Sequence, residues 1–121
     1  MELVEIFSDE RGHTHFRKSD LHLEERHYAP PSRPVRVSAD MRLTHGNFLV
    51  APPGWDDQFH PTPNRQLAVL LSGTATISAT DGQTINVQPG SVILLNDQAS
   101  RGHLTRVRGS EASFLLVGLA E

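Results

Sequence analysis

The stretch RQLAVLLSGTATISATDGQTINV, residues 65–87, decides the fold class of this chain. Its first part, 65–72, is apolar on both faces. Residues 74–80 alternate Ala and Ile with Thr and Ser, which is the pattern of a half-buried strand. Asp81-Gly82 then gives a strong signal for a two-residue hairpin turn, and 83–87 is expected to return as the partner strand. The stretch therefore predicts consecutive β-strands with a tight turn.

Short extended segments recur on both sides of this stretch, separated by Pro and Gly at intervals of about ten residues. Apolar residues do not recur at helical spacing over more than two turns anywhere in the chain. Regularly spaced short strands are typical of an all-β sandwich or barrel. We therefore expect one all-β domain over 1–121, with extended strands in 1–40 and the barrel core in 41–121.

The composition excludes several classes of protein. The 121 residues fit one domain, and the apolar runs at 67–71 and 114–120 fall far short of the roughly 20 residues that span a bilayer. A net charge of −3 without a basic cluster argues against nucleic acid as a partner. Without cysteine there is no thiolate nucleophile or ligand. Carboxylates in 1–6, where an export signal is basic, predict a cytoplasmic location.

Histidine is the main sign of chemistry, because the chain contains seven. His13 and His15 lie one residue apart, so on a strand both rings would share a face, but exposed or packing roles explain them more simply. His60 follows a Pro-Pro-Gly turn and precedes the apolar strand that begins near Gln66. His103 follows a loop near the end of the chain. His60 and His103 are thus the histidines placed beside core strands.

The surroundings of His60 resemble the first motif of the cupins, in which Gly, His, His, Glu and Gly follow one another at fixed spacing. Gly54, His60, Gln66 and Gly73 fall on that frame. Thr62 stands where the second His would be, and Gln66 replaces the Glu. The frame of the motif is therefore kept, whereas two of its usual ligands are replaced.

A weaker likeness to the second cupin motif follows. Pro89-Gly90 and the strand at 91–95 resemble its opening, and His103 comes about two residues later than that motif has its His. The resemblance to cupins spans residues 42–119. Within the cupins, the sequence most resembles small single-domain bacterial members of unassigned function. It implies a double-stranded β-helix, or jelly-roll, barrel with an extended N-terminal segment.

The resemblance implies a divalent metal, Fe, Zn, Ni or Mn, held by His60, Gln66 and His103, with His45 as a further ligand from the preceding strand. Because two usual ligands are replaced, a remote group has to complete the shell, and Asp56, Asp57 or Asp97 could supply charge at the rim. An amide in place of a carboxylate, however, leaves the metal charge uncompensated in a barrel of low dielectric constant. A polar pair that binds an organic ligand without metal is the alternative.

Two functions therefore stay open for a small-molecule site at the barrel mouth. One is a metal-assisted enzyme of the oxygenase, isomerase or cyclase type with His60 and His103 as catalytic residues, and the other is a metal-free cupin that binds a ligand or is structural. The expected substrate contacts are Trp55, Thr62, Asn64 and Arg65, although a large aromatic such as Trp55 more often covers a barrel end or a subunit contact. Exposed edges in the N-terminal third predict a homodimer.

Overall fold

The computed structural model describes residues 1–55 and 58–121, and these form nine strands and no helix. The strands are β1 (Glu2–Ser8), β2 (Thr14–Asp20), β3 (Leu23–Arg26), β4 (Val35–Ser38), β5 (Leu43–Ala51), β6 (Gln66–Ala79), β7 (Thr84–Val87), β8 (Val92–Asn96) and β9 (His103–Leu119). The expectation of an all-β chain is confirmed. The described part of the chain contains no helix able to cross a membrane.

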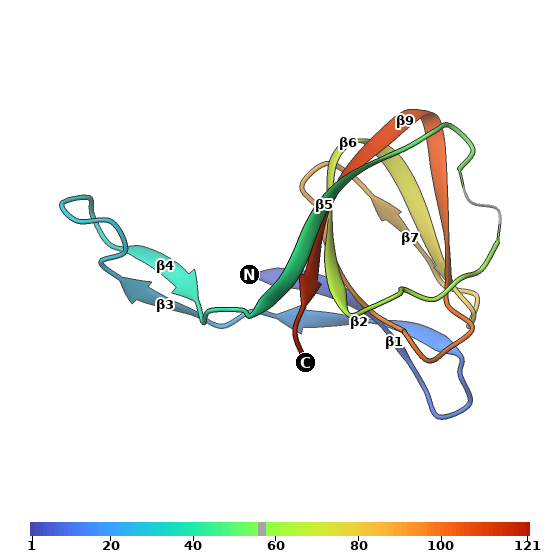
Figure 1. The fold of residues 1–121 in the computed structure, drawn as a ribbon, viewed down its shortest axis with the longest axis horizontal. Coiled ribbons are helices and arrows are strands. Elements are labelled where there is room, and N and C mark those ends of the chain that lie inside the picture. The colour runs from blue at the N-terminus through green and yellow to red at the C-terminus, as the bar shows by residue number, and fades with distance from the viewer. Residues whose placement is uncertain (56–57) are drawn as a thin grey trace.

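Seven strands form one strongly curved sheet (Figure 1). Its strand order is β2-β1-β8-β6-β9-β5, and β7 pairs with β6 beside this path. β1 runs parallel to β8, and the other pairs are antiparallel. In the described residues no pairing joins β2 to β5, so the sheet is open and these two strands end its strand order.

β6 and β9 are single long strands, although the sequence pattern predicted a break at Gly73 within 65–80 and separate strands at 102–107 and 112–119. The register between β6 and β9 shifts between Leu70 and Ser72 and again before Thr74. A Cβ at Gly73 would lie 2.6 Å from the Glu111 carbonyl oxygen, so the two backbones approach closely there. The predicted break is therefore a β-bulge, which bends a strand without ending it.

The concave face of the sheet holds the core. Gln66, Ala68 and Leu70 are buried, whereas Leu67 and Val69 between them are only half-buried, as the alternation of a strand requires. The inward side chains pack with those of the neighbouring strands in one apolar cluster that includes Ile6, Ile77, Leu95 and Phe114. The sheet therefore has a packed inner face and a separate outer face.

The N-terminal segment divides into two parts. β1 and β2 belong to the main sheet, because β1 pairs with β8. β3 and β4 form a separate two-stranded sheet that projects from the body in Figure 1, and we call residues 23–38 the arm. Among the described residues the strands of the arm pair only with each other.

A histidine between two carboxylates ties the turn after β1 to the turn after β6. His15 Nε2 lies 2.7 Å from Asp9 Oδ2, and His15 Nδ1 lies 2.9 Å from Asp81 Oδ2. The hydrogen bond to Asp9, followed by that to Asp81, raises the pKa of His15. The same bond to His15 lowers the pKa of Asp9 to about 2. His15 is thus an ion-pairing side chain between two turns.

This ion pair predicts a pH-dependent stability. Because the folded pKa of His15 is raised, its stabilisation is present below the ordinary pKa of about 6.5 and is lost as pH rises through the folded value. Because the pKa of Asp9 is lowered, its contribution is lost as pH falls from 3.8 towards about 2. Melting temperatures from pH 3 to 9 should therefore separate wild type from His15→Gln most between about pH 4 and 6.5.

His22→Gln is the matched control, because His22 is an exposed histidine of the segment that leads into β3. Its melting temperature should follow wild type at every pH. A constant difference between wild type and His15→Gln across the whole pH range would contradict the ion-pair account.

Candidate functional site

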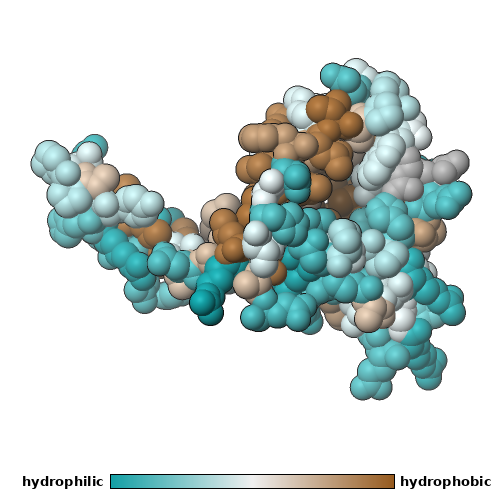
Figure 2. Space-filling view, viewed as in Figure 1, coloured by the Kyte–Doolittle hydropathy of each residue, from teal (hydrophilic) through white to brown (hydrophobic). Residues whose placement is uncertain are grey.

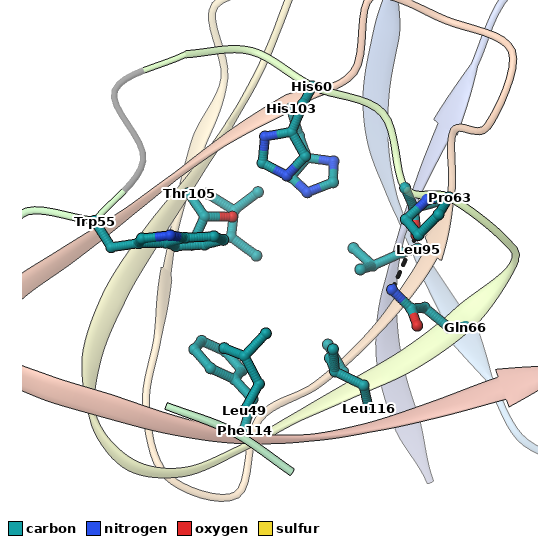
Figure 3. A pocket seen from close by; sticks show the side chains of 13 residues that line it. Leu49, Trp55, His60, Pro63, Gln66, Leu95, His103, Thr105, Phe114 and Leu116 are labelled. Carbon is teal, nitrogen blue, oxygen red and sulfur yellow. Dashed lines mark hydrogen bonds between the residues drawn. The ribbon is translucent and has the colours of Figure 1, made fainter. Parts of the chain in front are cut away.

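A pocket of about 230 Å³ opens on the concave face of the sheet. Most of its wall is apolar, and Figure 3 shows Leu49, Phe114 and Leu116 across the pocket from two imidazole rings. The polar side chains that line it are His60, Thr62, Gln66, His103 and Thr105. The remaining wall residues are Trp55, Pro63, Ala68, Ile77 and Leu95. The pocket therefore suits a mainly apolar molecule with few polar groups.

The backbone brings His60 and His103 together. Each residue donates its N–H to the carbonyl oxygen of the other, with both N–O distances 3.0 Å. This reciprocal pair places the ring centroids 4.9 Å apart with planes inclined by 54°. The sequence left open whether His103 converges with His60, and the structure brings both rings to the same end of the pocket.

Gly102 makes this close approach possible. Its φ is +87°, in the left-handed region that favours glycine, and a Cβ there would lie 2.0 Å from the His60 carbonyl carbon. No flexible side chain is involved in that contact, because the nearest atoms belong to the backbone of His60 and Pro61. The residue before His103 must therefore be glycine for the two histidines to pair.

A fully buried carboxylate orients His103. Asp97 Oδ2 lies 2.7 Å from His103 Nδ1, and Asp97 Oδ1 accepts a hydrogen bond from the Thr62 backbone N–H at 3.2 Å. A carboxylate only accepts hydrogen bonds, so His103 Nδ1 carries the proton. The remaining ring nitrogen, Nε2, is then left for a group bound in the pocket.

His60 contacts both the loop that precedes it and an aromatic side chain of the pocket. Its Nδ1 lies 3.3 Å from the Gln58 carbonyl oxygen, which is an acceptor. Trp55 presents its ring to His60 in an edge arrangement, with centroids 6.1 Å apart and planes inclined by 69°. The half-buried His60 thus connects the buried His103 to the aromatic wall of the pocket.

Gln66 lies on a different wall of the pocket from the two imidazole rings (Figure 3), and it is hydrogen-bonded to Thr62. Gln66 Nε2 donates to Thr62 Oγ1 at 3.0 Å, and that hydroxyl donates to the Asn64 carbonyl oxygen at 2.8 Å. Both side chains are buried. The amide of Gln66 is therefore held towards Thr62 rather than towards the imidazoles.

Three residues expected at the site, His45, Asn64 and Arg65, do not line this pocket. His45 lies opposite Gly118 of β9, is exposed, and bonds Thr44 Oγ1 through its Nδ1. Arg65 precedes the inward Gln66, so strand alternation directs it to the other face. Asn64 donates to the Arg65 carbonyl oxygen instead of facing the pocket. Trp55 and Thr62 do line it.

Asp97 is a buried partner of the pocket that sequence reasoning placed elsewhere. Its position in a polar loop suggested a charge at the rim, whereas the structure buries it completely against His103. Its place in the loop shortly before His103 is the only signal, and polar loops give many such signals. Asp56 and Asp57, the other two rim candidates, lie outside the described residues.

The described residues do not supply enough ligand side chains for a metal site. In residues 1–55 and 58–121 no group of three or more His, Asp or Glu side chains is arranged to hold a metal ion. Zinc and non-haem iron sites use at least three such protein ligands. The described residues offer two imidazoles, and the Gln66 amide nitrogen is bonded to Thr62.

Comparisons with known proteins inform the fold alone. No protein-family model matches this sequence, and no curated protein matches it. Among solved structures, the chain is similar to protein NMB1881 from Neisseria meningitidis, with a TM-score of 0.50 and 16% sequence identity. The similarity covers 68% of this chain and 84% of that chain.

Proposed function

We propose that this chain is a small cupin-like protein whose pocket binds a small, mainly apolar organic molecule and exchanges a proton with it at His103. The observation that carries the proposal is the buried Asp97–His103 pair, which lies beside His60 at one end of an apolar pocket. The sequence resemblance supports the cupin-like part of this proposal, and the chain is all-β, as a cupin is.

The proton transfer follows from the hydrogen bonds of His103. With Nδ1–H bonded to Asp97, neutral His103 presents the lone pair of Nε2 to the pocket. An O–H bond of the ligand breaks, its electron pair stays on the ligand oxygen, and the proton forms a new bond to Nε2. The Asp97 carboxylate stabilises the resulting imidazolium, as a carboxylate does for a histidine base in general.

The size and walls of the pocket indicate the class of ligand. A volume of about 230 Å³ lies below the roughly 300–1,000 Å³ of typical ligand pockets, so one ring fills it. Trp55 and Phe114 offer aromatic contact to a flat ring. A phenol or a cyclic enol combines these features with an acidic O–H group beside an imidazole.

The probe for this proposal is 4-nitrophenol, because its absorbance reports whether the bound phenol is ionised. We expect saturable binding to wild type with growth of the phenolate band. Asp97→Asn should lower the affinity about ten- to a hundredfold, because the amide donates to Nδ1 and leaves Nε2 protonated, which removes an interaction of roughly 1.5–3 kcal/mol. Absorbance titrations of both proteins measure this change.

His22→Ala serves as the control, because it removes an exposed histidine far along the chain from the pocket residues. It should bind like wild type. If wild type fails to bind the probe, or if Asp97→Asn forms as much bound phenolate as wild type, the proposal is wrong.

A divalent metal at His60 and His103 is the second proposal. One observation favours it: a carboxylate bonded to the outer nitrogen of a histidine also commonly supports metal-ligating histidines. Elemental analysis of wild type and His60→Ala, both purified without chelator, distinguishes the metal proposal from the proton-transfer proposal. Stoichiometric metal that disappears in His60→Ala would favour the metal centre, and 4-nitrophenol binding that persists in metal-free protein would favour proton transfer by the protein alone.

A further inference from the structure

In the part of the chain that the structure describes, the arm is a two-stranded sheet apart from the main sheet. Its two strands pair in the register Leu23↔Ser38 to Arg26↔Val35, and among the described residues neither pairs with another strand. Tyr28 in its loop is 70% exposed, and Val35 is 50% exposed. An isolated two-stranded hairpin is marginally stable in water and usually needs packing against another surface. The arm therefore requires an apolar surface outside its own body.

A surface of this kind lies on the outer face of the sheet. Phe48, Leu115 and Val69 are cross-strand neighbours on β5, β9 and β6, so their side chains share one face. Phe48 is 79% exposed and Val50, two residues along the same strand, is 59% exposed. Figure 2 shows a hydrophobic surface on the part of the body that carries β5. Apolar patches of this kind mark interaction sites.

The same region has a free strand edge. β5 ends the strand order and pairs only with β9 in the described part of the chain, so one side of its backbone is unpaired. An exposed edge beside an apolar face is a template for another chain. The unpaired backbone edge and the exposed Phe48 both belong to β5, so one segment of a partner chain can cover both.

We propose that the arm of one copy of this chain packs on the outer face and free edge of β5 in a second copy, in a two-fold symmetric dimer. The arm leads directly into β5, so each copy carries both the docking segment and its receptor. A two-fold dimer joins both such pairs at once, because its interface uses the same surfaces on each copy. The proposal therefore assigns the interface of the predicted homodimer to the arm and to β5.

The charge distribution suits a second copy as the partner. Residues 21–40 contain three Asp or Glu and three Lys or Arg, so this segment is neutral, whereas the whole chain carries −3. A neutral segment meets no like-charge repulsion when it approaches a negative copy. The row Phe48, Leu115 and Val69 contains no charged group to desolvate.

The dimer also bears on the pocket. Leu49, which follows Phe48 on β5, points to the opposite face and lines the pocket. β5 is an edge strand, and edge strands without a partner open more readily than central ones. A partner arm on β5 would therefore hold one wall of the pocket in place.

Light scattering on the full chain tests the interface. Wild type at tens of micromolar should have about twice the monomer mass of 13.4 kDa. Phe48→Asp and Val35→Asp, placed on the receptor and on the arm, should each give the monomer mass. Phe59→Asp is the control, because Phe59 is an exposed phenylalanine of the loop before His60, and it should remain dimeric. A monomeric wild type, or a dimer that survives both substitutions, overturns the proposal.

Cross-linking tests which surfaces meet. The chain has no cysteine, so single cysteines report specific contacts. A mixture of Val35→Cys and Phe48→Cys chains, allowed to exchange subunits and treated with a short bismaleimide, should give a covalent dimer of the two variants. Val35→Cys mixed with Thr84→Cys, which is exposed on β7, should not. Equal cross-linking in both mixtures, or none in the first, contradicts arm exchange even if the protein dimerises.

Discussion

Gly102→Ala is expected to destabilise the protein by at least about 3 kcal/mol, at the upper end of what single substitutions cost. The new methyl group would lie 2.0 Å from the His60 carbonyl carbon, 2.2 Å from its oxygen and 2.3 Å from the Pro61 nitrogen. These are backbone atoms of a hydrogen-bonded pair, so they cannot move aside without separating His60 from His103. Urea denaturation measures the loss.

Gly82→Ala is the matched control for this substitution. Gly82 has φ +95°, close to that of Gly102, but a Cβ there meets no atom within 4 Å. It therefore carries only the backbone cost of the left-handed region, about 1–2 kcal/mol. Equal losses for Gly82→Ala and Gly102→Ala would show that the close approach to His60 contributes nothing.

Asp97→Ala is expected to cost about 2–6 kcal/mol of unfolding free energy, about 1–3 kcal/mol for each of two buried donors that lose their acceptor. The substitution leaves the buried Thr62 N–H and His103 Nδ1–H without their acceptor. Unpaired buried donors keep the full cost of lost hydration. The same variant should lose 4-nitrophenol binding, because His103 is no longer held in one tautomer.

Asp20→Ala is the surface control. Asp20 pairs with the N-terminal ammonium at 3.1 Å and is 83% exposed, so its removal should cost less than about 1 kcal/mol. Denaturation curves of the two variants should therefore differ clearly. An Asp97→Ala protein as stable as Asp20→Ala would show that the buried pair does not stabilise the pocket.

The sequence predicted the strands of the sheet because their pattern is local. Alternation in 74–80 and the Asp81-Gly82 turn depend only on neighbouring residues, and the structure has a strand pair joined there. The inward face of β6, with Gln66, Ala68 and Leu70, follows from the same period. The bulge at Gly73 did not follow, because a break and a bend have the same local pattern.

The site was predictable only in part, because its essential contacts join distant segments. The sequence pattern placed His60 and His103 next to core strands. Their pairing, however, depends on a β-bridge between two residues that are 43 positions apart in the sequence. Asp97 faces His103 because the loop after β8 turns inward, and no spacing rule predicts that turn. Arg65 and His45 do not line the pocket, and their nearness to Gln66 and to the core strands in the sequence does not show which side chains reach it.

The central claim is that Asp97 holds His103 with Nε2 open to the pocket. The most direct measurement is a long-range ¹H–¹⁵N spectrum of the histidine rings, recorded with and without 4-nitrophenol. We predict that neutral His103 carries its proton on Nδ1 and that the probe shifts its Nε2 signal while His22 stays unchanged. A proton on Nε2 of neutral His103, or a ring signal that saturating probe leaves unmoved, would contradict the account.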